Sequence, residues 1–413
     1  MSILVINAGS SSVKFALFDF DSLERLAEGL LDWAGDQPTV GGHHEATITL
    51  RPAAGEPVSH RRDVPDYRAG VVEALRLMEE CHLDVVGGGP IGVVGHRLIH
   101  GGEEIRRPVS IDAAMKKTIA RSAHLAPLHI PAGLAAIEAT ETALPGVLQV
   151  GIFDTAFYGA IPPAAYLYPV PYEWYEEWGI RRFGYHGTSH AYCTERAGEM
   201  LPGDPNALRL VICHLGQGAS ATAVRGGVAV TNTMGFTPLE GFMMGTRCGT
   251  VDPGILLYVQ REHGLSVDEL DEILHKKSGL LGVSGLSSDF RCLEQAAAEG
   301  HARAQLALDM YAYRVRAMVG ALAVTLGGID ALVFTGGIGE NSAWVRGEIC
   351  RGLECLGVHL DAVRNADFRP DCDLATAASR VRVLLVHTRE ELMIAREARH
   401  LALQSQQEAS QAH

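Results

Sequence analysis

Apolar positions in the first half of the chain follow two periods, one typical of strands and one typical of helices. Short runs with alternating or continuous apolar residues predict strands, and longer segments with apolar residues every three or four positions predict helices. The predicted strands are the two that flank the turn in VINAGSSSVKFALFD (Val5 to Asp19), Ala46–Leu50, a β-branched run from Ile91, and Val147–Phe153; the predicted helices are Tyr67–Cys81, one that begins near Ile111, and Leu134–Thr142. Strands and helices in alternation are the signature of an α/β domain.

The second half repeats the architecture of the opening. A strand over Leu210–His214 is followed by the small-residue turn LGQGAS and by two more predicted strands, Ala221–Val224 and Val228–Val230. The remaining predicted elements are a long amphipathic helix over Ala302–Leu326, strands at Ala331–Thr335 and Val381–Val386, a helix over Glu391–Leu401, and a polar, frayed end with the sequence SQQEASQAH. This repeat indicates a duplicated domain, because its two copies lie much further apart than the units of a solenoid, which recur every 20–50 residues or so.

Length and composition favour a soluble protein with two domains. The chain has 413 residues, of which 47% are hydrophobic and 20% charged. Its formal net charge of −14 argues against a nucleic-acid or anionic-membrane partner, which needs a concentrated basic surface. The eight cysteines are scattered without CxxC spacing, and we expect reduced thiols in a cytoplasm. Because the N-terminus lacks a signal-peptide pattern and no run of about 18 apolar residues occurs, neither export nor membrane insertion is expected.

Four glycine-bearing segments predict phosphate-binding turns: Asn7–Ser12, His214–Ser220, Gly245–Gly249 and Gly336–Asn341. We expect each of them to follow a strand, where small residues let backbone N–H groups point at an anion. One such segment is more often only a turn, whereas four together favour phosphate binding. None of them matches the P-loop or the dinucleotide fingerprint.

Several charged side chains lie at the ends of predicted strands or between glycines. Asp154 ends a strand and Glu390 opens the last helix. A divalent metal on a nucleotide needs only one or two such carboxylates, although a helix cap or a partner for the helix dipole is the structural alternative. Arg97 and Arg247 lie in glycine-rich loops that let a carboxylate or phosphate approach. His186, in FGYHGTSH, is by itself more often a structural histidine, and the histidines show no zinc-ligand spacing.

Ten motifs, in this order, resemble the acetate kinase family. They are NAGSSSVKFALFD, GHRLIHGG, LAPLH, FDTAF, RRFGYHGTSH, HLGQGAS, TNTMGFTPLEGFMMGTRCGTVDPG, SGLSSDFR, FTGGIGEN and EELMIAR. The resemblance runs over nearly the whole chain and implies an α/β fold of two duplicated ribonuclease-H-like domains with an ATP cleft between them. It puts 1–150 and the C-terminal helix 387–405 in the N-terminal domain, 151–386 in a C-terminal domain with most nucleotide contacts, and 406–413 in a polar tail.

The reaction that this resemblance implies is reversible, in-line transfer of the ATP γ-phosphoryl group to acetate, which gives acetyl phosphate and ADP. The implied enzyme is a cytoplasmic homodimer that acts on small molecules and binds neither nucleic acid nor membrane. Its implied cofactor is Mg²⁺, with Mn²⁺ as an alternative, and Asn7 and Glu390 match the metal site of the family.

Further roles follow from the resemblance, residue by residue. The residues that match catalytic positions are Arg97, Asp154, His186 and Arg247, and Arg97 also matches the arginine that binds the substrate carboxylate. The residues that match the pocket for the acetate methyl are Ile99, Leu128, Tyr185 and Pro238. The residues that match ATP contacts are Lys14, Ser10, Ser12, His214, Leu215, Gly216, Gln217, Gly218, Asp289, Phe290, Arg291, Gly337, Ile338, Gly339, Glu340 and Asn341.

These residue types suit the transfer of a phosphoryl group between two anions. Arginines, a histidine, a metal ion and backbone amides neutralise the charge that the reaction brings together. A carboxylate is already ionised at neutral pH and needs no general base, so we expect Asp154 to organise hydrated magnesium.

The chain departs from the family pattern at a few positions. Gln217 stands where the family usually has asparagine, and Arg389 stands where asparagine usually precedes Glu390. Neither change removes a catalytic side chain, so we expect an active enzyme. The alternatives are a kinase for propionate or another short carboxylate, and a non-catalytic, actin-like nucleotide-binding protein.

Overall fold

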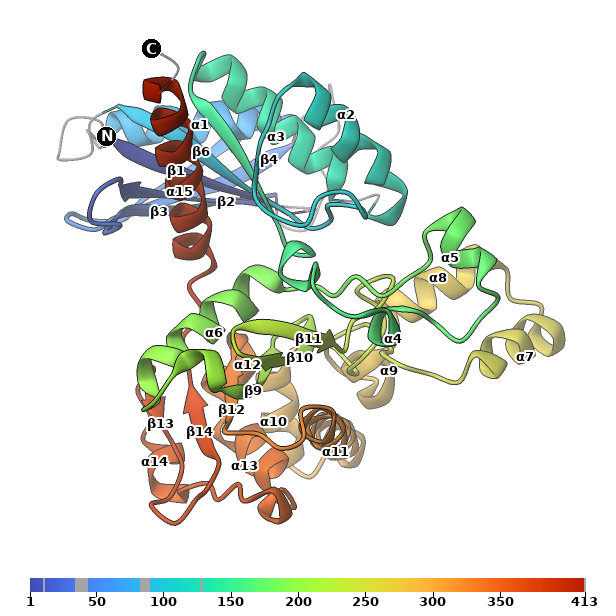
Figure 1. Cartoon of the computed structure of the whole chain (residues 1–413). Helices are drawn as coiled ribbons and strands as arrows, with labels where there is room; N and C mark the ends of the chain where they lie inside the picture. Colours follow the sequence, from blue (N-terminus) through green and yellow to red (C-terminus); the bar gives the residue numbers. More distant parts are fainter. Residues whose placement is uncertain (10–11, 34–43, 82–89, 127–128, 412–413) are drawn as a thin grey trace. The chain divides into compact units, whose positions relative to one another are not determined.

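The structure is a computed structural model that describes residues 1–9, 12–33, 44–81, 90–126 and 129–411 (Figure 1). Two predicted site residues, Ser10 and Leu128, lie outside the described residues. The chain divides into two compact units. The first consists of Met1–Phe157 together with the residues from Arg389 onward, and the second of Tyr158–Thr388.

The first unit is built around an eight-stranded mixed sheet with the strand order β5-β4-β3-β2-β1-β6-β8-β7. Neighbours from β1 to β5 pair antiparallel, whereas β1, β6 and β8 pair in parallel. The strands are β1 (Ser2–Ala8), β2 (Ser12–Asp19), β3 (Arg25–Asp32), β4 (Glu45–Pro52), β5 (Val58–Asp63), β6 (Ile91–Leu98), β7 (Val109–Ser110) and β8 (Leu148–Phe153).

Helices cover both faces of this sheet. Helices α1 (Tyr67–Glu80) and α3 (Ile130–Ala143) pack on one face, against a layer that includes Leu4 and Ile6 of β1. Helix α15 (Glu390–Gln411) packs on the other face, against Ile3 and Val5. This division follows from the alternation of side chains along a strand, which sends successive residues to opposite faces. A shorter helix, α2 (Ala113–Arg121), packs beside α3.

The second unit contains a six-stranded sheet with the order β11-β10-β9-β12-β14-β13. The strands are β9 (Arg209–Leu215), β10 (Ala219–Arg225), β11 (Val228–Asn232), β12 (Ala331–Thr335), β13 (Cys372–Asp373) and β14 (Arg382–Leu385). The helices are α4 (Pro163–Tyr166), α5 (Glu173–Trp178), α6 (Gly187–Met200), α7 (Pro253–His263), α8 (Val267–Lys276), α9 (Gly279–Ser284), α10 (Phe290–Ala298), α11 (Ala302–Thr325), α12 (Gly336–Asn341), α13 (Ala343–Cys350) and α14 (Ala362–Ala366). Helix α11 packs against β9 and β10, and α6 packs against β9 and β12. Among the helices of the described residues, none has both the length and the apolar character needed to cross a membrane.

Five strands of each sheet follow the same plan, which confirms the predicted duplicated α/β fold. The series β3-β2-β1-β6-β8 and β11-β10-β9-β12-β14 both contain two antiparallel pairings followed by two parallel ones. In chain order, each series begins with a strand that pairs antiparallel with the strand directly after it, β1 with β2 and β9 with β10. The pair β9–β10 is therefore the structural counterpart of the pair β1–β2.

Four details differ from the expectations of the sequence. The segment Gly245–Gly249 does not follow a strand, because β11 ends at Asn232 and the intervening chain is irregular. Gly336–Asn341 forms helix α12 instead of an open loop. The polar C-terminal segment is helical through Gln411, since α15 continues along it. Strands β3 and β5 were missed because their charged and half-exposed residues obscure the alternation.

Candidate active site

Three predicted site residues of the first unit lie side by side in one row of the sheet. Asn7 of β1 is opposite Lys14 of β2 on one side and Arg97 of β6 on the other. In each strand, these residues share the parity of the side chains that pack against α15, so all three belong to that face. One amide and two cations from three strands therefore share one edge of the unit. Ser12, the first residue of β2, accepts a hydrogen bond at its carbonyl from Gly9, at 2.8 Å.

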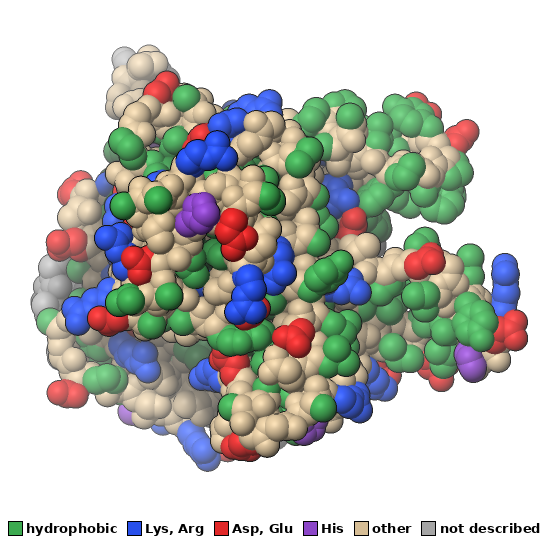
Figure 2. All heavy atoms as spheres, turned by 90° about the horizontal axis from the view of Figure 1, so that it is seen from below, with side chains coloured by type: hydrophobic (Ala, Val, Ile, Leu, Met, Phe, Trp, Pro, Cys, Tyr) green, Lys and Arg blue, Asp and Glu red, His purple; other side chains and the backbone are tan. Residues whose placement is uncertain are grey.

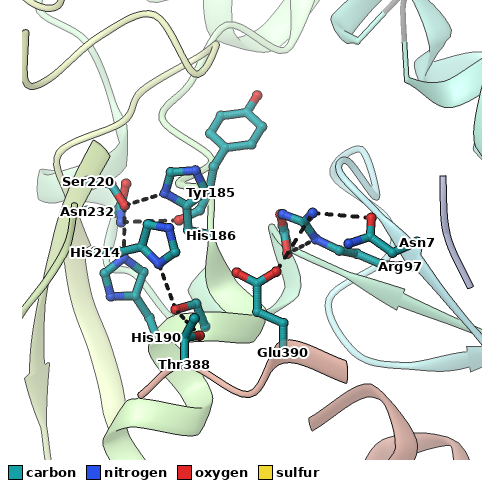
Figure 3. Close-up of polar contacts among 12 residues, drawn as sticks. Asn7, Arg97, Tyr185, His186, His190, His214, Ser220, Asn232, Thr388 and Glu390 are labelled. Carbon is teal, nitrogen blue, oxygen red and sulfur yellow. Dashed lines mark hydrogen bonds and ion pairs between the residues drawn. The ribbon is translucent and has the colours of Figure 1, made fainter. Parts of the chain in front are cut away.

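Arg97 is the centre of a polar cluster (Figure 3). Its Nη2 donates to Asp154 Oδ2 at 2.7 Å, and its Nε donates to Asp154 Oδ1 at 3.3 Å. Its Nη1 donates to Asn7 Oδ1 at 3.3 Å and lies 3.9 Å from Glu390 Oε2. Asp154 is in place because β8 ends at Phe153, and Glu390 is in place because α15 begins with it. The structure thus brings together four of the predicted residues.

Charges within this cluster largely compensate one another. Burial opposes the charged guanidinium, yet Asp154 and then Glu390 raise the pKa of Arg97 above its ordinary value. The Asp154 side chain is only 2% exposed, so solvent screens the pair little. The guanidinium is therefore held in a fixed orientation and stays charged at every physiological pH.

Oxygen atoms are the donors that this cluster offers to a metal. Asn7, Asp154 and Glu390 supply one amide and two carboxylates, which is the ligand chemistry that Mg²⁺ and Mn²⁺ prefer. No group of three or more His, Cys, Asp or Glu side chains among the described residues could hold a metal. Mg²⁺ on a nucleotide needs only one or two carboxylates together with phosphate and water, so these residues fit a metal that arrives with ATP.

In the second unit, β9, its turn and β10 carry another group of predicted residues. The Gly216 amide donates to the Gly218 carbonyl at 3.1 Å and closes the turn that follows Leu215, a buried residue. Gln217 is exposed, and its carbonyl accepts from the Gly245 amide at 3.2 Å, which ties the turn to the segment Gly245–Gly249. Near the end of β9, His214 Nδ1 lies 2.8 Å from Ser189 Oγ (Figure 3).

His186 has a strained backbone at the start of helix α6. Its φ of 60° and ψ of 26° lie in the left-handed region, which non-glycine residues rarely adopt. Its side chain does not cap the helix; instead Nδ1 lies 2.9 Å from Ser220 Oγ. The imidazole also faces that of His214, with ring centroids 4.5 Å apart. Strain of this kind is concentrated at functional sites, which favours a functional role over a purely structural one for His186.

Gly218 is where His186 and Arg247 meet. A Cβ added to Gly218 would lie 3.2 Å from His186 Nε2 and 3.5 Å from Arg247 Nη1. Both side chains therefore reach the same side of the turn, and the absence of a side chain at Gly218 leaves that space to them. The structure brings together two of the residues that match catalytic positions of the family.

Arg247 is a cation without an acidic partner among the described residues. Its Nη1 donates to the Pro238 carbonyl at 3.2 Å and approaches the Met244 sulfur at 3.7 Å. Burial lowers the pKa of Arg247 from its ordinary value. A partly desolvated guanidinium is costly unless an anion pairs with it, so this site favours a phosphate or carboxylate.

Side chains that the sequence did not single out hold residues 234–247 in place. Arg182 Nη1 donates to the carbonyls of residues 232–234 at 3.0 to 3.1 Å, and its Nη2 donates to Glu240 at 2.7 Å. Tyr168 also donates to Glu240. The sequence RRFG, with two arginines before an aromatic residue and a glycine, could have pointed to Arg182. Its partner Glu240 could not have been found in this way, because it lies 58 positions away.

Of the residues predicted to surround the acetate methyl, Tyr185 and Pro238 belong to the second unit. Tyr185 is buried, and its hydroxyl donates to the carbonyl of Phe236 at 2.8 Å, so it anchors the segment that leads to Pro238. Ile99 belongs to the first unit, where it is half-buried just after β6. Leu128 is outside the described residues. The methyl pocket stays a prediction.

Several residues predicted to contact adenosine serve the fold as well. Asp289 caps helix α10 by accepting from the Arg291 amide at 2.9 Å, and Arg291 pairs with it at 2.8 Å. Phe290 is buried, with its ring edge-on to Tyr311 at 5.4 Å between centroids. The ring of Phe290 therefore packs in the core, and the contacts of this segment with ATP stay a prediction.

Helix α12 contains the last group of predicted ATP contacts. Gly337 and Asn341 are exposed, and the Asn341 amide donates to the Gly337 carbonyl at 2.8 Å. Ile338 is half-buried and Gly339 buried. Glu340 is 7% exposed, and its carboxylate accepts from the Gly336 and Thr388 amides at 3.0 Å and lies 2.5 Å from His387 Nδ1. The Glu340 side chain is therefore occupied in holding the chain that leads into α15.

The chain is similar to known proteins over nearly its whole length. The model of the acetokinase family matches residues 2–396. The chain belongs to this family. An acetate kinase from Cyanothece sp. is 46% identical over 404 residues, which cover 96% of this chain and 97% of that protein.

Solved structures of the family agree with the fold described above. The crystal structure of Porphyromonas gingivalis acetate kinase has a TM-score of 0.88 and 40% identity, covering 97% of this chain and 99% of that one. That of a propionate kinase from Francisella tularensis has a TM-score of 0.87 and 35% identity, with the same coverage. The predicted membership of the family is confirmed, and with it the assignment of the chain as a kinase.

Proposed function

We propose that this protein transfers the γ-phosphoryl group of ATP to acetate, reversibly, to give acetyl phosphate and ADP. The observation that carries the proposal is Arg247, a partly buried cation without an acidic partner among the described residues, beside His186 at the turn that ends in Gly218. Such a pair suits a phosphoryl group whose equatorial oxygens carry the charge of the transition state.

Each unit contains residues suited to a different part of this reaction. Arg97 would bind the acetate carboxylate in the first unit, and the turn after β9 would bind phosphate oxygens through its amides, with His186 and Arg247 as further donors. An acetate oxygen attacks the γ-phosphorus, the bond to the β–γ bridging oxygen breaks, and ADP leaves with that electron pair. No proton has to move, because the carboxylate is ionised at neutral pH.

Asn7 and Glu390 would hold Mg²⁺ or Mn²⁺, with Asp154 oriented beside them by Arg97. When bound, the ion neutralises phosphate charge and aligns the phosphate oxygens. The oxygen-only donors support this assignment over zinc, which favours nitrogen and sulfur ligands.

A single assay tests the function and its main alternative. Purified protein is incubated with Mg-ATP and acetate, propionate or butyrate, and acyl phosphate is trapped with hydroxylamine. We expect hydroxamate with acetate and less with the longer acids, because Tyr185 and Ile99 are large residues for the pocket. Absence of hydroxamate with every acid would contradict a kinase, and a preference for propionate would favour the activity named for the Francisella relative.

We also propose that the protein is a homodimer whose interface includes α11 and α7. No residue of α7 is buried, and three of its apolar residues, Ile255, Leu257 and Tyr258, are more than half exposed. On α11, Tyr313 and Val324 are 67% and 76% exposed. Figure 2 shows hydrophobic side chains gathered at the right of the view, the side on which α5 and α7 lie in Figure 1. Apolar surface of this extent favours a partner, and a second copy of the chain is the commonest one.

The variant Tyr313→Glu/Val324→Glu tests this interface, with Gln305→Glu on the same helix as its control. Sedimentation should give twice the chain mass for the wild type and the control, and a smaller mass for the double variant. A monomeric wild type, or a double variant that stays dimeric, would contradict the assignment.

The compartment that we propose is the cytoplasm. All eight cysteines are free thiols, including the exposed Cys292 and Cys355, as expected in a reducing compartment. Cell fractionation with an antibody to the chain should recover it with cytoplasmic markers.

A further inference from the structure

One serine hydroxyl lies between two imidazole rings in the second unit (Figure 3). Ser220 Oγ is 2.9 Å from His186 Nδ1 and 2.8 Å from His190 Nε2. Ser220 is fully buried, on β10 directly after the Gly218 turn, and His190 is fully buried in the first turn of α6. A hydroxyl has only one proton to donate, so it can donate to only one of the two rings. The other ring must then donate to Ser220.

The buried environment of His190 decides the direction of these bonds. Burial, and then the neighbouring His214, lower the pKa of His190 well below its ordinary value, so the ring is neutral. Its other nitrogen, Nδ1, has no hydrogen-bond partner among the described residues. A proton on Nδ1 would leave a buried N–H without an acceptor, and orphaned buried N–H groups are the rarest kind of unsatisfied group. The His190 proton therefore belongs on Nε2, where it is donated to Ser220.

The direction of the second bond follows from the first. Because Ser220 accepts from His190, its own hydroxyl proton is free to be donated to His186 Nδ1. His186 then accepts at Nδ1 and carries its proton on Nε2, the nitrogen that lies nearest the Gly218 turn. Protonating His186 at Nδ1 as well would turn the Ser220 hydroxyl away from it.

We propose that Ser220 and His190 are positioning residues that fix His186 as a neutral ring with its proton on Nε2, aimed at the phosphoryl oxygens beside Arg247. The role of His186 toward phosphate rests on the proposed function, whereas the position of its proton rests on the contacts alone. In this arrangement Arg247 supplies the positive charge and His186 supplies a directed hydrogen bond. His186 Nε2 and Arg247 Nη1 both lie between 3 and 4 Å from the position that a Cβ on Gly218 would occupy. A neutral imidazole can lie this close to the guanidinium, whereas a positively charged imidazole would be repelled by it.

Two measurements test this proposal independently. The first is the long-range ¹H–¹⁵N spectrum of protein with ¹⁵N-labelled histidine, which reports the protonated nitrogen of each ring in the enzyme without ligands. The His186 signals are assigned by their loss in His186→Asn, since asparagine tolerates the left-handed backbone. We expect Nε2–H alone in the wild type and a mixture of both tautomers in Ser220→Ala.

The second measurement is the steady-state kinetics of Ser220→Ala and His190→Gln. We expect kcat to fall about ten- to a hundredfold in Ser220→Ala, as for other residues that orient a ligand-binding histidine, with both KM values within about twofold. His190→Gln keeps an N–H donor for Ser220 and should retain more of kcat than His190→Leu. The control is Ser379→Ala, which removes another buried hydroxyl of the same unit, whose partners are Gly357, His359 and Val381.

The outcomes separate this inference from the proposed function. A wild type that makes no acyl phosphate but shows Nε2–H at His186 would refute the function and keep the tautomer. A proton on Nδ1 of His186 in the wild type would overturn the inference, and so would an active wild type whose kcat survives Ser220→Ala unchanged. Thermal unfolding of each variant identifies any loss of kcat that comes from misfolding.

Discussion

Arg97 and Arg247 are both largely withdrawn from water, yet the protein treats their charges in opposite ways. Arg97 is flanked by Asp154 and Glu390 and keeps its pKa above the ordinary value. Among the described residues, the hydrogen-bond partners of Arg247 are one carbonyl and one sulfur, and burial lowers its pKa. Arg97 already has anionic partners in the protein, whereas Arg247 has only neutral partners among the described residues.

This difference indicates which of the two arginines can gain more from an interaction with a negatively charged ligand. A cation that is already paired gains little from a new anion and serves mainly to orient it, whereas an unpaired, desolvated cation is left to stabilise the charge that develops in the transition state. We therefore expect Arg247 to contribute more to the transition state and Arg97 more to the stability of its unit.

The largest effect should come from Arg247→Ala. We expect kcat to fall about 10³-fold, equivalent to ~4 kcal/mol, because the charge that the transition state develops loses its cation. The affinity for ATP should change little and the protein should be no less stable, since a desolvated charge has been removed. Calorimetric titration with ATP and the hydroxamate assay measure the two quantities.

Arg351→Ala is the matched control, because that arginine is exposed and forms an ion pair with Glu348 on the surface. If Arg247→Ala lost ATP binding together with turnover, the arginine would act in the ground state and the contrast with Arg97 would disappear.

The next largest effect should come from Arg97→Met, which keeps the length of the side chain and removes its charge. Asp154 and Glu390 would be left without their cation, and we expect a loss of ~3 kcal/mol in the free energy of unfolding of the first unit. Urea unfolding followed by the fluorescence of Trp33, which lies in that unit's core, measures this loss. Equal stability of Arg97→Met and Arg247→Ala would show that the ion pair does not set the two arginines apart.

A smaller, pH-dependent effect is expected for Glu340→Gln. Burial opposes the charge, but His387 and the Thr388 and Gly336 amides lower the pKa of Glu340 below its ordinary 4.5. A depressed carboxyl pKa stabilises the folded state above the unfolded value and loses this contribution as the pH falls through the folded value. We expect Glu340→Gln to be less stable by ~1 kcal/mol at pH 7, because His387 is partly exposed and solvent screens the pair.

The difference between wild type and Glu340→Gln should shrink below pH 4.5, where the wild-type carboxyl also takes up a proton. Melting temperatures between pH 3.5 and 7.5, with Glu348→Gln as a control for an acid of a surface pair, test this trend. A difference that grew toward low pH would contradict the assigned direction.

The smallest effect should come from Tyr185→Phe, which removes one hydroxyl and leaves the ring. The Phe236 carbonyl loses its donor, and we expect a cost of ~1 kcal/mol in stability. The KM for acetate should rise by less than about fivefold, the equivalent of that energy. A tighter KM for propionate in the variant would show that this hydroxyl limits the pocket through the segment that it anchors.

The sequence predicted the parts of the site that depend on strand ends. Asp154 follows from a strand whose apolar run stops at a polar residue. Arg97 was expected in a glycine-rich loop but lies within β6, and Asn7 and Lys14 were named by the resemblance to the family. The four residues belong to strands, or directly follow a strand, that are neighbours in one sheet. The resemblance to a family then named the residues of the second unit, which the structure groups around Gly218.

Other parts could not be predicted because they depend on contacts between distant segments. The engaged carboxylate of Glu340 depends on His387 and Thr388, some 47 positions further along the chain. The position of the Ser220 hydroxyl between His186 and His190 could not be predicted either, because these histidines are 34 and 30 positions away in the sequence. The edge-on contact of the Phe290 ring with Tyr311 joins residues 21 positions apart, and the ATP contact that the motif predicts for Phe290 stays a prediction.

Because α15 belongs to the first unit, the two units become complete at different times during synthesis on the ribosome. The second unit is one continuous segment, Tyr158–Thr388, and all of it has been translated before α15 exists. The first unit begins translation earlier but lacks Ile394, Ala395 and Ala398, which cover Ile3 and Val5, until the last residues emerge. We expect the part that is made first to be completed last, and ribosome-bound chains that stop before Glu390 to protect the second sheet from proteolysis while leaving β1 accessible.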